Sequence, residues 1–199
     1  KGGSDNMSSQ VLQRIKDGYE NLEIREVVPF YMTKIPHLDK MRQTILSNKF
    51  SSVFRQLEVT YIHGETETGK TRYVLDTYGY ENVYKITNYE HPFDAYETQD
   101  VILFDEFRSS LPLKDMLQYL DGYPCRLPAR YTERQACYTK VFLISNIPFE
   151  KQYINIQETE SKSWSAFRRR ITKYLYFEKK NKYLPYFDKN NIDIIESYE

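Results

Sequence analysis

The chain contains the stretch Gly64-Glu65-Thr66-Glu67-Thr68-Gly69-Lys70-Thr71, which matches the pattern G-x-x-x-x-G-K-[ST] at every fixed position. Glycine at positions 64 and 69 permits the backbone angles that bend such a loop around phosphate groups. Consecutive backbone N–H groups and the N-terminus of the following helix form a cradle for anions. In this pattern Lys70 reaches the β- and γ-phosphates, and the Thr71 hydroxyl binds Mg²⁺. The stretch therefore predicts a loop that binds the phosphates of a nucleotide.

The residues on either side of this loop have the character that a phosphate-binding loop requires. A β-rich run at residues 59–62 leads into it, and helix-compatible sequence follows from Lys70 to about residue 77. A strand before the loop and a helix after it make a chance match much less plausible. Glu65 and Glu67 place two carboxylates beside a site for a polyanion, so we expect both side chains to point to solvent.

A second motif is the apolar run Val101-Ile102-Leu103-Phe104, which is followed directly by Asp105 and Glu106. A continuously apolar run is typical of a strand that is buried on both faces of a parallel sheet. Two carboxylates at the end of such a strand, downstream of a phosphate-binding loop, form the Walker B pattern. Asp105 is predicted to hold Mg²⁺ through water, and Glu106 to orient and deprotonate the attacking water. The alternative is a strand that ends in two ordinary surface acids.

A third motif is the apolar run Val141-Phe142-Leu143-Ile144, which ends in Ser145-Asn146. On a neighbouring strand, Asn146 would lie close to the γ-phosphate and could form a hydrogen bond with it or with the attacking water. The alternative is a turn-forming Ser-Asn pair before Ile147-Pro148, which is common in proteins. The residues of this motif alone leave both interpretations open.

Strand-like and helix-like segments alternate along the rest of the chain. Residues 83–86 and 175–177 have strand character, whereas residues 112–120 and 163–171 have helix character. This alternation predicts an α/β fold, with a central, mainly parallel sheet and helices on both of its sides. We assign this P-loop NTPase core to residues 55–178.

The two ends of the chain differ from this core. Residues 8–50 are predicted to form a small helical domain, because Val11 and Ile15 mark one helix face and Pro36 can begin a second helix. Residues 1–7 are rich in Gly, Ser, Asn and Asp and are predicted to be a disordered linker. Residues 179–199 are predicted to be a solvated C-terminal tail.

Composition excludes several other classes of protein. The chain has 199 residues, of which 40% are hydrophobic and 28% charged, the range of globular proteins. It has no long apolar stretch and no targeting signal at its start, so no membrane partner is expected. Its two cysteines form no disulfide framework and no zinc site, which fits a reducing compartment. The formal net charge is zero, so a nucleic-acid partner would need a local basic patch. The 19 tyrosines are read mainly as core and interface residues, with base stacking as the alternative.

The three motifs GETETGKT, VILFDEF and VFLISN, in this order, resemble the superfamily 3 helicase domain of rolling-circle replication initiators. These are the Rep proteins of circular single-stranded DNA viruses, such as circoviruses and geminiviruses, and of related bacterial plasmids. The resemblance spans about residues 8–178 and includes Leu-Asp-Gly-Tyr-Pro at residues 120–124 and Ala-Phe-Arg-Arg-Arg-Ile at residues 166–171. It implies an AAA+-like ATPase core in an ATP-dependent 3′-to-5′ DNA helicase, which moves along single-stranded DNA as a ring.

The resemblance also implies a role for individual residues. Lys70 and Thr71 bind phosphate and Mg²⁺, Asp105 and Glu106 are the Walker B pair, and Asn146 is the polar sensor residue. Either Arg169 or Arg170 is an arginine finger that reaches the γ-phosphate held by a neighbouring subunit. The alternative for these arginines is a solvated helix face or a DNA-contacting patch, and the choice between the two arginines stays open.

Residues 126–139 match the place of a hairpin that lines the central pore in this family. The hairpin carries Arg126, Arg130 and Arg134, which would concentrate positive charge around a DNA strand. Family members often have glycines at the tip, whereas this chain has Tyr131-Thr132. Tyr131 is read either as a base-stacking residue or as an exposed loop tyrosine. The helical domain at residues 8–50 resembles the family's oligomerisation collar, which implies a homo-oligomer, with a hexamer as the expected ring.

Family members commonly have an N-terminal nicking domain with a His-hydrophobe-His pair and a Tyr-x-x-Lys nucleophile. The histidines of this chain, His37, His63 and His91, are not paired in this way, and its Tyr-x-x-Lys matches lie outside the needed context. We therefore expect no nicking activity here and a nicking domain that has been separated from this chain. We expect an intracellular protein, in the host nucleus if it is viral and in the cytoplasm if it comes from a bacterial plasmid. Two alternative functions remain. One is an RNA-acting or packaging NTPase of the same superfamily, and the other is a nucleotide-gated DNA-binding platform in which Glu106 takes no part in hydrolysis.

Overall fold

The computed structural model describes residues 3–19, 23–24, 35–130, 133–179 and 182–188. The chain divides into two compact units, residues 1–49 and residues 50–199. Each unit has a hydrophobic core of its own. No helix among the described residues combines the length and the apolar character that a membrane crossing needs.

The described part of the first unit contains the helices α1 (Gly3–Lys16) and α3 (Ile35–Phe50). Among these described residues, the buried side chains of its core are Val11, Ile15, Ile24 and Leu38. The two predicted helices are thus present. The disordered linker predicted for residues 1–7 is wrong from Gly3 onward, where α1 already begins. Ser, Asp and Asn are favoured at helix N-termini as well as in linkers, so composition could not separate the two.

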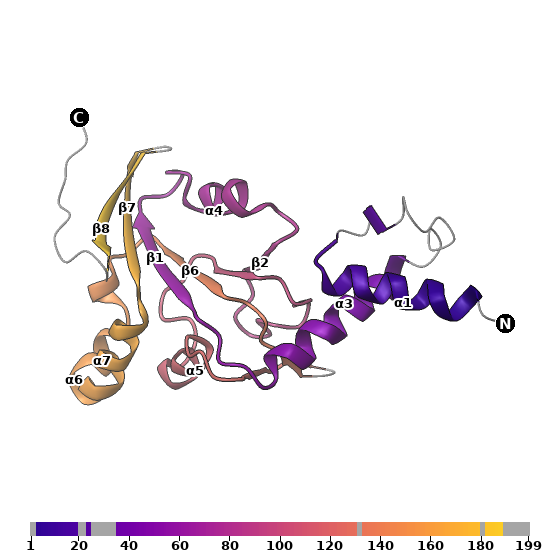
Figure 1. Cartoon of the computed structure of the whole chain (residues 1–199). Helices are drawn as coiled ribbons and strands as arrows, with labels where there is room; N and C mark the ends of the chain where they lie inside the picture. The colour runs from indigo at the N-terminus through magenta and orange to yellow at the C-terminus, as the bar shows by residue number, and fades with distance from the viewer. Residues whose placement is uncertain (1–2, 20–22, 25–34, 131–132, 180–181, 189–199) are drawn as a thin grey trace. The chain divides into compact units, whose positions relative to one another are not determined.

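The second unit is built on a six-stranded sheet with the order β2-β3-β6-β1-β7-β8 (Figure 1). Its strands are β1 (Glu58–Gly64), β2 (Val83–Ile86), β3 (Val101–Phe104), β6 (Lys140–Ser145), β7 (Lys173–Lys179) and β8 (Lys182–Asp188). The first five strands of that order pair in parallel, and β8 pairs antiparallel with β7. A separate two-stranded sheet is formed by β4 (Arg126–Leu127) and β5 (Arg134–Gln135).

Helices cover both faces of the large sheet, α4 on one side and α5, α6 and α7 on the other (Figure 1). Their bounds are α4 (Lys70–Tyr78), α5 (Leu113–Tyr119), α6 (Ile154–Thr159) and α7 (Ser161–Arg170), and a short 3-10 helix η2 spans Phe149–Lys151. Along β1, Tyr61 packs in the core that includes α5 and α7, whereas Ile62 packs in the core beneath α4. The predicted α/β fold is therefore confirmed, including the strands at 101–104 and 141–144 that are buried on both faces.

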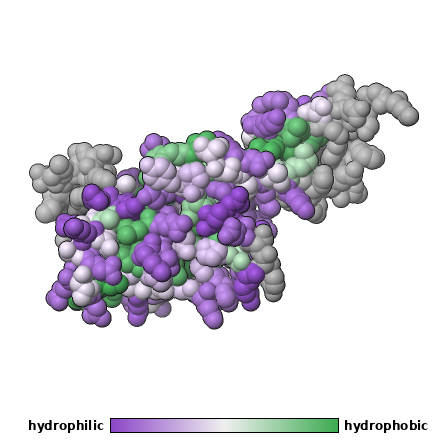
Figure 2. Space-filling view, turned by 90° about the horizontal axis from the view of Figure 1, so that it is seen from below, coloured by the Kyte–Doolittle hydropathy of each residue, from purple (hydrophilic) through white to green (hydrophobic). Residues whose placement is uncertain are grey.

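The larger core is unusually rich in tyrosine. Six of its buried side chains are Tyr61, Tyr96, Tyr119, Tyr138, Tyr153 and Tyr174. Five of these hydroxyl groups, all but that of Tyr119, have a backbone or side-chain partner among the described residues; for example, the Tyr138 hydroxyl donates to the Tyr119 carbonyl over 2.7 Å. The core and interface interpretation is thus confirmed for these residues. The face shown in Figure 2 is mainly hydrophilic, with smaller hydrophobic areas between polar side chains.

Strand β8 corrects the prediction of a solvated tail for residues 179–199. Residues Lys182–Asp188 pair with β7, so this part of the segment extends the sheet. The strand contains Pro185, which cannot donate a hydrogen bond and is therefore confined to edge strands. β8 tolerates this proline because it is the outermost strand. It forms its backbone pairing with β7, the neighbouring strand of the sheet.

Candidate nucleotide site

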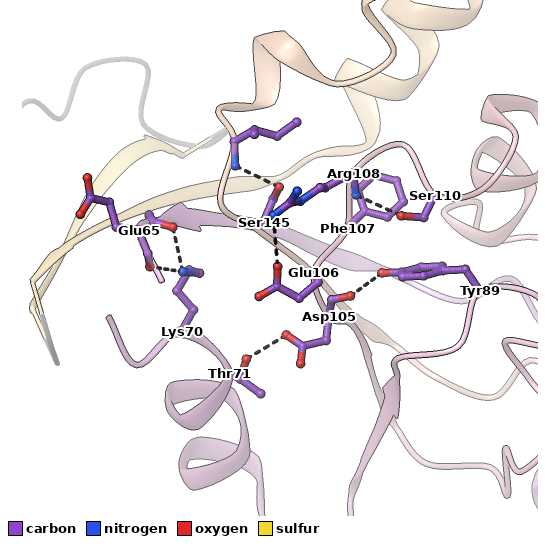
Figure 3. A network of polar contacts seen from close by, with 12 residues as sticks. Glu65, Lys70, Thr71, Tyr89, Asp105, Glu106, Phe107, Arg108, Ser110 and Ser145 are labelled. Carbon is purple, nitrogen blue, oxygen red and sulfur yellow. Dashed lines mark hydrogen bonds and ion pairs between the residues drawn. The ribbon is translucent and has the colours of Figure 1, made fainter. Parts of the chain in front are cut away.

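The candidate site lies at the carboxyl ends of three adjacent strands, β3, β6 and β1. The register pairs His63 of β1 with Ser145 of β6, and Phe104 of β3 with Leu143 of β6. The three sequence motifs therefore meet at one edge of the sheet, where parallel α/β folds bind their ligands. Figure 3 shows Lys70, Thr71, Asp105 and Glu106 facing one another at this edge.

In the phosphate loop, residues 64–71, Gly64 and Gly69 occupy positions that disfavour a side chain. A Cβ atom at position 64 would collide with the carbonyl oxygen of Phe177 on β7, so only glycine permits this approach of the two strands. Gly69 has a φ of 89°, in the left-handed region, directly before α4 begins. Glu65 and Glu67 are both exposed, as predicted, so their carboxylates are directed away from the loop.

The Lys70 ammonium lies inside the phosphate loop. It donates hydrogen bonds to the Gly64 carbonyl over 2.8 Å, to the Glu65 carbonyl, and to the Thr68 hydroxyl over 3.3 Å. Burial lowers the pKa of Lys70, while the nearby carboxylates Glu106 and Asp105 oppose this shift. The loop thus holds a desolvated cation at its centre, where a phosphate group would be attracted strongly.

The phosphate loop and the acidic strand end are joined by a direct hydrogen bond. The Thr71 hydroxyl donates to Asp105 Oδ1 over 2.8 Å, and Asp105 itself is 8% exposed. A hydroxyl and a carboxylate are hard oxygen donors of the kind that Mg²⁺ prefers, and Mg²⁺ in proteins keeps several waters alongside such donors. The residues present therefore fit this cation.

Two further residues contact Asp105, and neither was predicted from the sequence. Lys85 of β2 forms an ion pair with Asp105 Oδ2 over 2.7 Å, and the Tyr89 hydroxyl donates to the Asp105 carbonyl over 2.7 Å. The Tyr89 pKa is raised, chiefly by burial. A lysine inside the short strand at 83–86 was the one signal that could have indicated the first contact.

Glu106 has an unusual backbone. Its φ is 53°, a left-handed conformation that is unfavourable for a residue with a Cβ and that is found preferentially at functional sites. Its side chain is 62% exposed and lies 3.8 Å from the Arg108 guanidinium. The carboxylate is thus presented to solvent beside the phosphate loop, in a place where it can contact a water molecule.

Asn146 follows β6 at the same edge of the sheet. Its side-chain oxygen is buried and has no hydrogen-bond partner among the described residues. A buried amide oxygen without a partner costs about 1–3 kcal/mol, so such groups usually serve a ligand or a water. The structure therefore places an unsatisfied amide next to the Walker residues.

The arginines at the end of α7 lie near the amino end of β1, away from the carboxyl ends of the strands where the phosphate loop lies. Helix α7 ends at Arg170, and two residues later Thr172 donates its backbone N–H to the Val59 carbonyl over 2.8 Å. Gly64 follows Val59 by five positions on β1, which corresponds to about 17 Å along the strand. The chain therefore does not bring Arg169 or Arg170 to its own phosphate loop.

The two candidate finger residues differ in their surroundings. Arg170 forms an ion pair with Asp121 over 2.6 Å and donates to the Ala166 carbonyl over 3.0 Å. Arg169 is exposed, as is Arg168 before it. Arg169 is thus the more exposed of the two candidate residues.

The segment 126–139 contains the antiparallel pair β4 and β5, so it is a hairpin. Arg130 pairs with the Asp94 carboxylate and also donates its backbone N–H to it over 2.9 Å. Arg134 donates to the Asp94 carbonyl over 3.3 Å, while Arg126 is exposed on β4. The loop around Asp94, which the sequence analysis did not single out, therefore anchors the hairpin. Tyr131 lies outside the described residues.

The sheet order and the phosphate loop between β1 and α4 define a P-loop NTPase fold of AAA+-like topology. No protein-family model matches the chain. Its sequence is similar to the Replication-associated protein of goose circovirus, 27% identical over 179 residues, which are 84% of this chain and 55% of that protein. The corresponding protein of canary circovirus is 28% identical over 121 residues, 61% of this chain and 39% of that protein. That of beak and feather disease virus is 30% identical over 96 residues, 48% of this chain and 32% of that protein.

These similarities confirm the resemblance to Rep proteins of circular single-stranded DNA viruses. The chain spans about half of the length of these relatives or less. Among solved structures, the Hsp104–ADP complex of S. cerevisiae is similar at 17% identity and a TM-score of 0.43, covering 84% of this chain and 38% of that chain. A TM-score of 0.43 is too low for this likeness to bear on function.

Proposed function

We propose that this chain is the ATPase motor of a replication-associated protein, an ATP-dependent DNA helicase of superfamily 3. The observation that carries the proposal is the 2.8 Å hydrogen bond from Thr71 to Asp105, which joins the phosphate loop to the acidic strand end. The similarity to circovirus Replication-associated proteins supports DNA replication as the context. The 3′-to-5′ polarity follows from the resemblance alone.

In this proposal each residue at the carboxyl edge of the sheet has a separate task. Lys70 and the backbone of the phosphate loop bind the β- and γ-phosphates, and Thr71 and Asp105 hold Mg²⁺. Mg²⁺ held by these residues would supply positive charge next to the phosphates. Glu106 accepts a proton from the attacking water, and Asn146 forms a hydrogen bond with the γ-phosphate or with that water. The water oxygen then bonds to the γ-phosphorus as the bond to the β-phosphate oxygen breaks.

The arginine finger in this proposal is Arg169, and it acts on a neighbouring subunit. Arg169 is not expected to act on its own subunit's loop for a geometric reason: the residues after α7 pair with Val59, and Val59 is about 17 Å along β1 from Gly64 of the phosphate loop. Arg170 is the weaker candidate because its side chain is only 26% exposed, whereas Arg169 is exposed. Hydrolysis would therefore need a ring in which one subunit supplies the loop and the next supplies Arg169. The helical unit at residues 8–50 is the proposed oligomerisation domain of that ring, with a hexamer as the proposed size.

The Glu106→Gln variant tests whether the chain is a hydrolase. We expect it to bind an ATP analogue as the wild type does, but to release phosphate at least about 100-fold more slowly, because the amide cannot accept the proton. Steady-state phosphate release and analogue binding are the measurements. Glu97→Gln, at an exposed carboxylate on the loop before β3, is the matched control. Unchanged turnover in Glu106→Gln would instead favour a nucleotide-gated assembly platform.

The hairpin is the proposed contact with single-stranded DNA. We expect Arg130→Ala to keep its basal ATPase activity but to lose the stimulation by single-stranded DNA, because a phosphate contact is removed. The slope of log affinity against log salt concentration should decrease by about 0.7 for this one contact. Arg72→Ala, at an exposed arginine of α4 that pairs with Asp76, is the control.

DNA affinity that does not change in Arg130→Ala would remove the hairpin from the DNA path. The same titration with single-stranded RNA of equal length separates DNA-acting from RNA-acting enzymes. Stronger stimulation by RNA than by DNA would favour the RNA-acting or packaging NTPase over the proposed DNA helicase.

A further inference from the structure

Three residues with left-handed backbone conformations lie close to one buried side chain behind the Walker B motif. They are Glu106, Ser109 and Tyr153, with φ angles of 53°, 54° and 52°. None of them is a glycine, so each conformation is unfavourable on its own and must be stabilised by its surroundings. The side chain that links them is Gln152, which is completely buried.

The Gln152 amide nitrogen lies among residues of three strands or the loops that follow them. Its two N–H groups face three acceptors, the Tyr61 hydroxyl at 2.7 Å, the Phe107 carbonyl at 3.0 Å and the Ser145 hydroxyl at 3.2 Å. Tyr61 belongs to β1, Ser145 ends β6, and Phe107 follows β3 by three positions. Because a carbonyl can only accept, the contact with Phe107 identifies the nitrogen as the end of the amide that faces Phe107.

The Gln152 amide oxygen holds the rest of the loop. It accepts a hydrogen bond from the Ser109 hydroxyl over 2.8 Å. That hydroxyl in turn accepts the Tyr153 backbone N–H over 2.7 Å. Both ends of one amide are therefore used, and they bind the loop after Glu106 to the segment after β6.

This network fixes the peptide groups on both sides of Glu106. On the far side, Phe107 donates its N–H to the Ile144 carbonyl over 2.7 Å and accepts from Gln152 at its own carbonyl. On the near side, the Asp105 carbonyl accepts from the Tyr89 hydroxyl. The peptide groups on both sides of Glu106 are thus hydrogen-bonded, whereas its side chain is 62% exposed.

We propose that Gln152 is a positioning residue for hydrolysis, which holds Glu106 in its left-handed conformation and in register with the end of β6. The inference rests on the proposed function, because it assigns Gln152 an effect on the catalytic carboxylate. Gln152 contacts the loop at Phe107 and Ser109, and it contacts β6 at Ser145, the neighbour of Asn146. It acts on the reacting water only through these residues.

The test is the Gln152→Met variant, which keeps the length of the side chain and removes all of its hydrogen bonds. We expect kcat for ATP to fall by about 10- to 100-fold, while KM and the affinity for an ATP analogue change by less than about threefold. Gln157→Met is the matched control: Gln157 donates to the Glu150 and Gln152 carbonyls, each over 2.7 Å, and not to the catalytic loop. We expect its kcat to equal that of the wild type.

A double-mutant cycle distinguishes positioning of Glu106 by Gln152 from a purely structural role of Gln152. In a Glu106→Gln background, Gln152→Met should lower the residual turnover no further, because the group that it positions is already gone. A further loss as large as in the wild-type background would overturn the inference, as would an unchanged kcat in the single variant. Wild-type turnover in Glu106→Gln would overturn the proposed function itself, and this inference with it.

Ser109→Ala carries the test if Gln152→Met does not fold. It removes only the hydroxyl that joins Gln152 to Tyr153, at a position that is partly exposed. We expect a smaller decrease in kcat, about threefold to tenfold, again without a change in analogue affinity. An unchanged kcat in folded Ser109→Ala protein, with Gln152→Met unfolded, would count against positioning.

Discussion

Lys70→Ala is expected to abolish ATP hydrolysis, with a decrease in turnover of roughly 1,000-fold or more. Lys70 is the cation that the phosphate loop holds at its centre through the carbonyl groups of Gly64 and Glu65. Alanine at this position leaves those carbonyls facing the phosphates without a positive charge between them. Nucleotide affinity should therefore fall together with turnover, in contrast to Glu106→Gln, which should lose turnover alone.

Phosphate release and the binding of a fluorescent ATP analogue measure these two effects. Lys114→Ala, at an exposed lysine of α5, is the matched control and should behave as the wild type. Retained turnover in Lys70→Ala would contradict the assignment of the phosphate loop. Lost turnover with unchanged analogue affinity would contradict the more specific claim that Lys70 binds phosphate in the ground state.

Arg169→Ala is expected to lower turnover by about 10³- to 10⁵-fold, the usual contribution of an arginine finger. Arg170→Ala should have a much smaller effect on turnover. It breaks the pair with Asp121, which is partly exposed and contributes at most about 1 kcal/mol to stability. Arg168→Ala, in the same turn of α7, is the control for a general loss of positive charge.

A mixing experiment tests whether Arg169 acts on a neighbouring subunit. Lys70→Ala and Arg169→Ala proteins should each be inactive alone, and a mixture should recover part of the activity. Recovery is expected because some interfaces then combine an intact phosphate loop from one subunit with an intact arginine from the next. A mixture that stays inactive while the two proteins co-assemble would contradict action across the interface, as would an equal loss in Arg168→Ala.

The local parts of the site could be predicted from the sequence because their requirements are local. The phosphate loop needs glycines that allow its backbone angles and N–H groups that are consecutive in the chain. The strands at 101–104 and 141–144 are apolar along their whole length because both of their faces are covered. Polar residues directly after such strands must lie at their carboxyl ends, so Asp105, Glu106 and Asn146 could be expected together.

The contacts that hold these residues in place could not be predicted in the same way. Gln152 bonds to Tyr61 across 91 positions of sequence and to Phe107 across 45. Asp94 anchors Arg130 across 36 positions. A buried glutamine and a half-buried loop aspartate have no sequence pattern that distinguishes them, because each acquires its role only when distant segments come together.

The sequence by itself determined that a nucleotide-phosphate loop, a Walker B strand and a polar strand end lie on an α/β fold. The tertiary structure alone decided three further points. It paired Lys182–Asp188 with β7 as the edge strand β8, and it placed Lys85 on Asp105. It also put the residues that follow α7 beside Val59, about 17 Å along β1 from Gly64. The physical reason is that local backbone conformation and burial determine which residue types occur at successive positions, so they can be read from the sequence. Strand order and side-chain partners depend instead on which distant segments pack side by side.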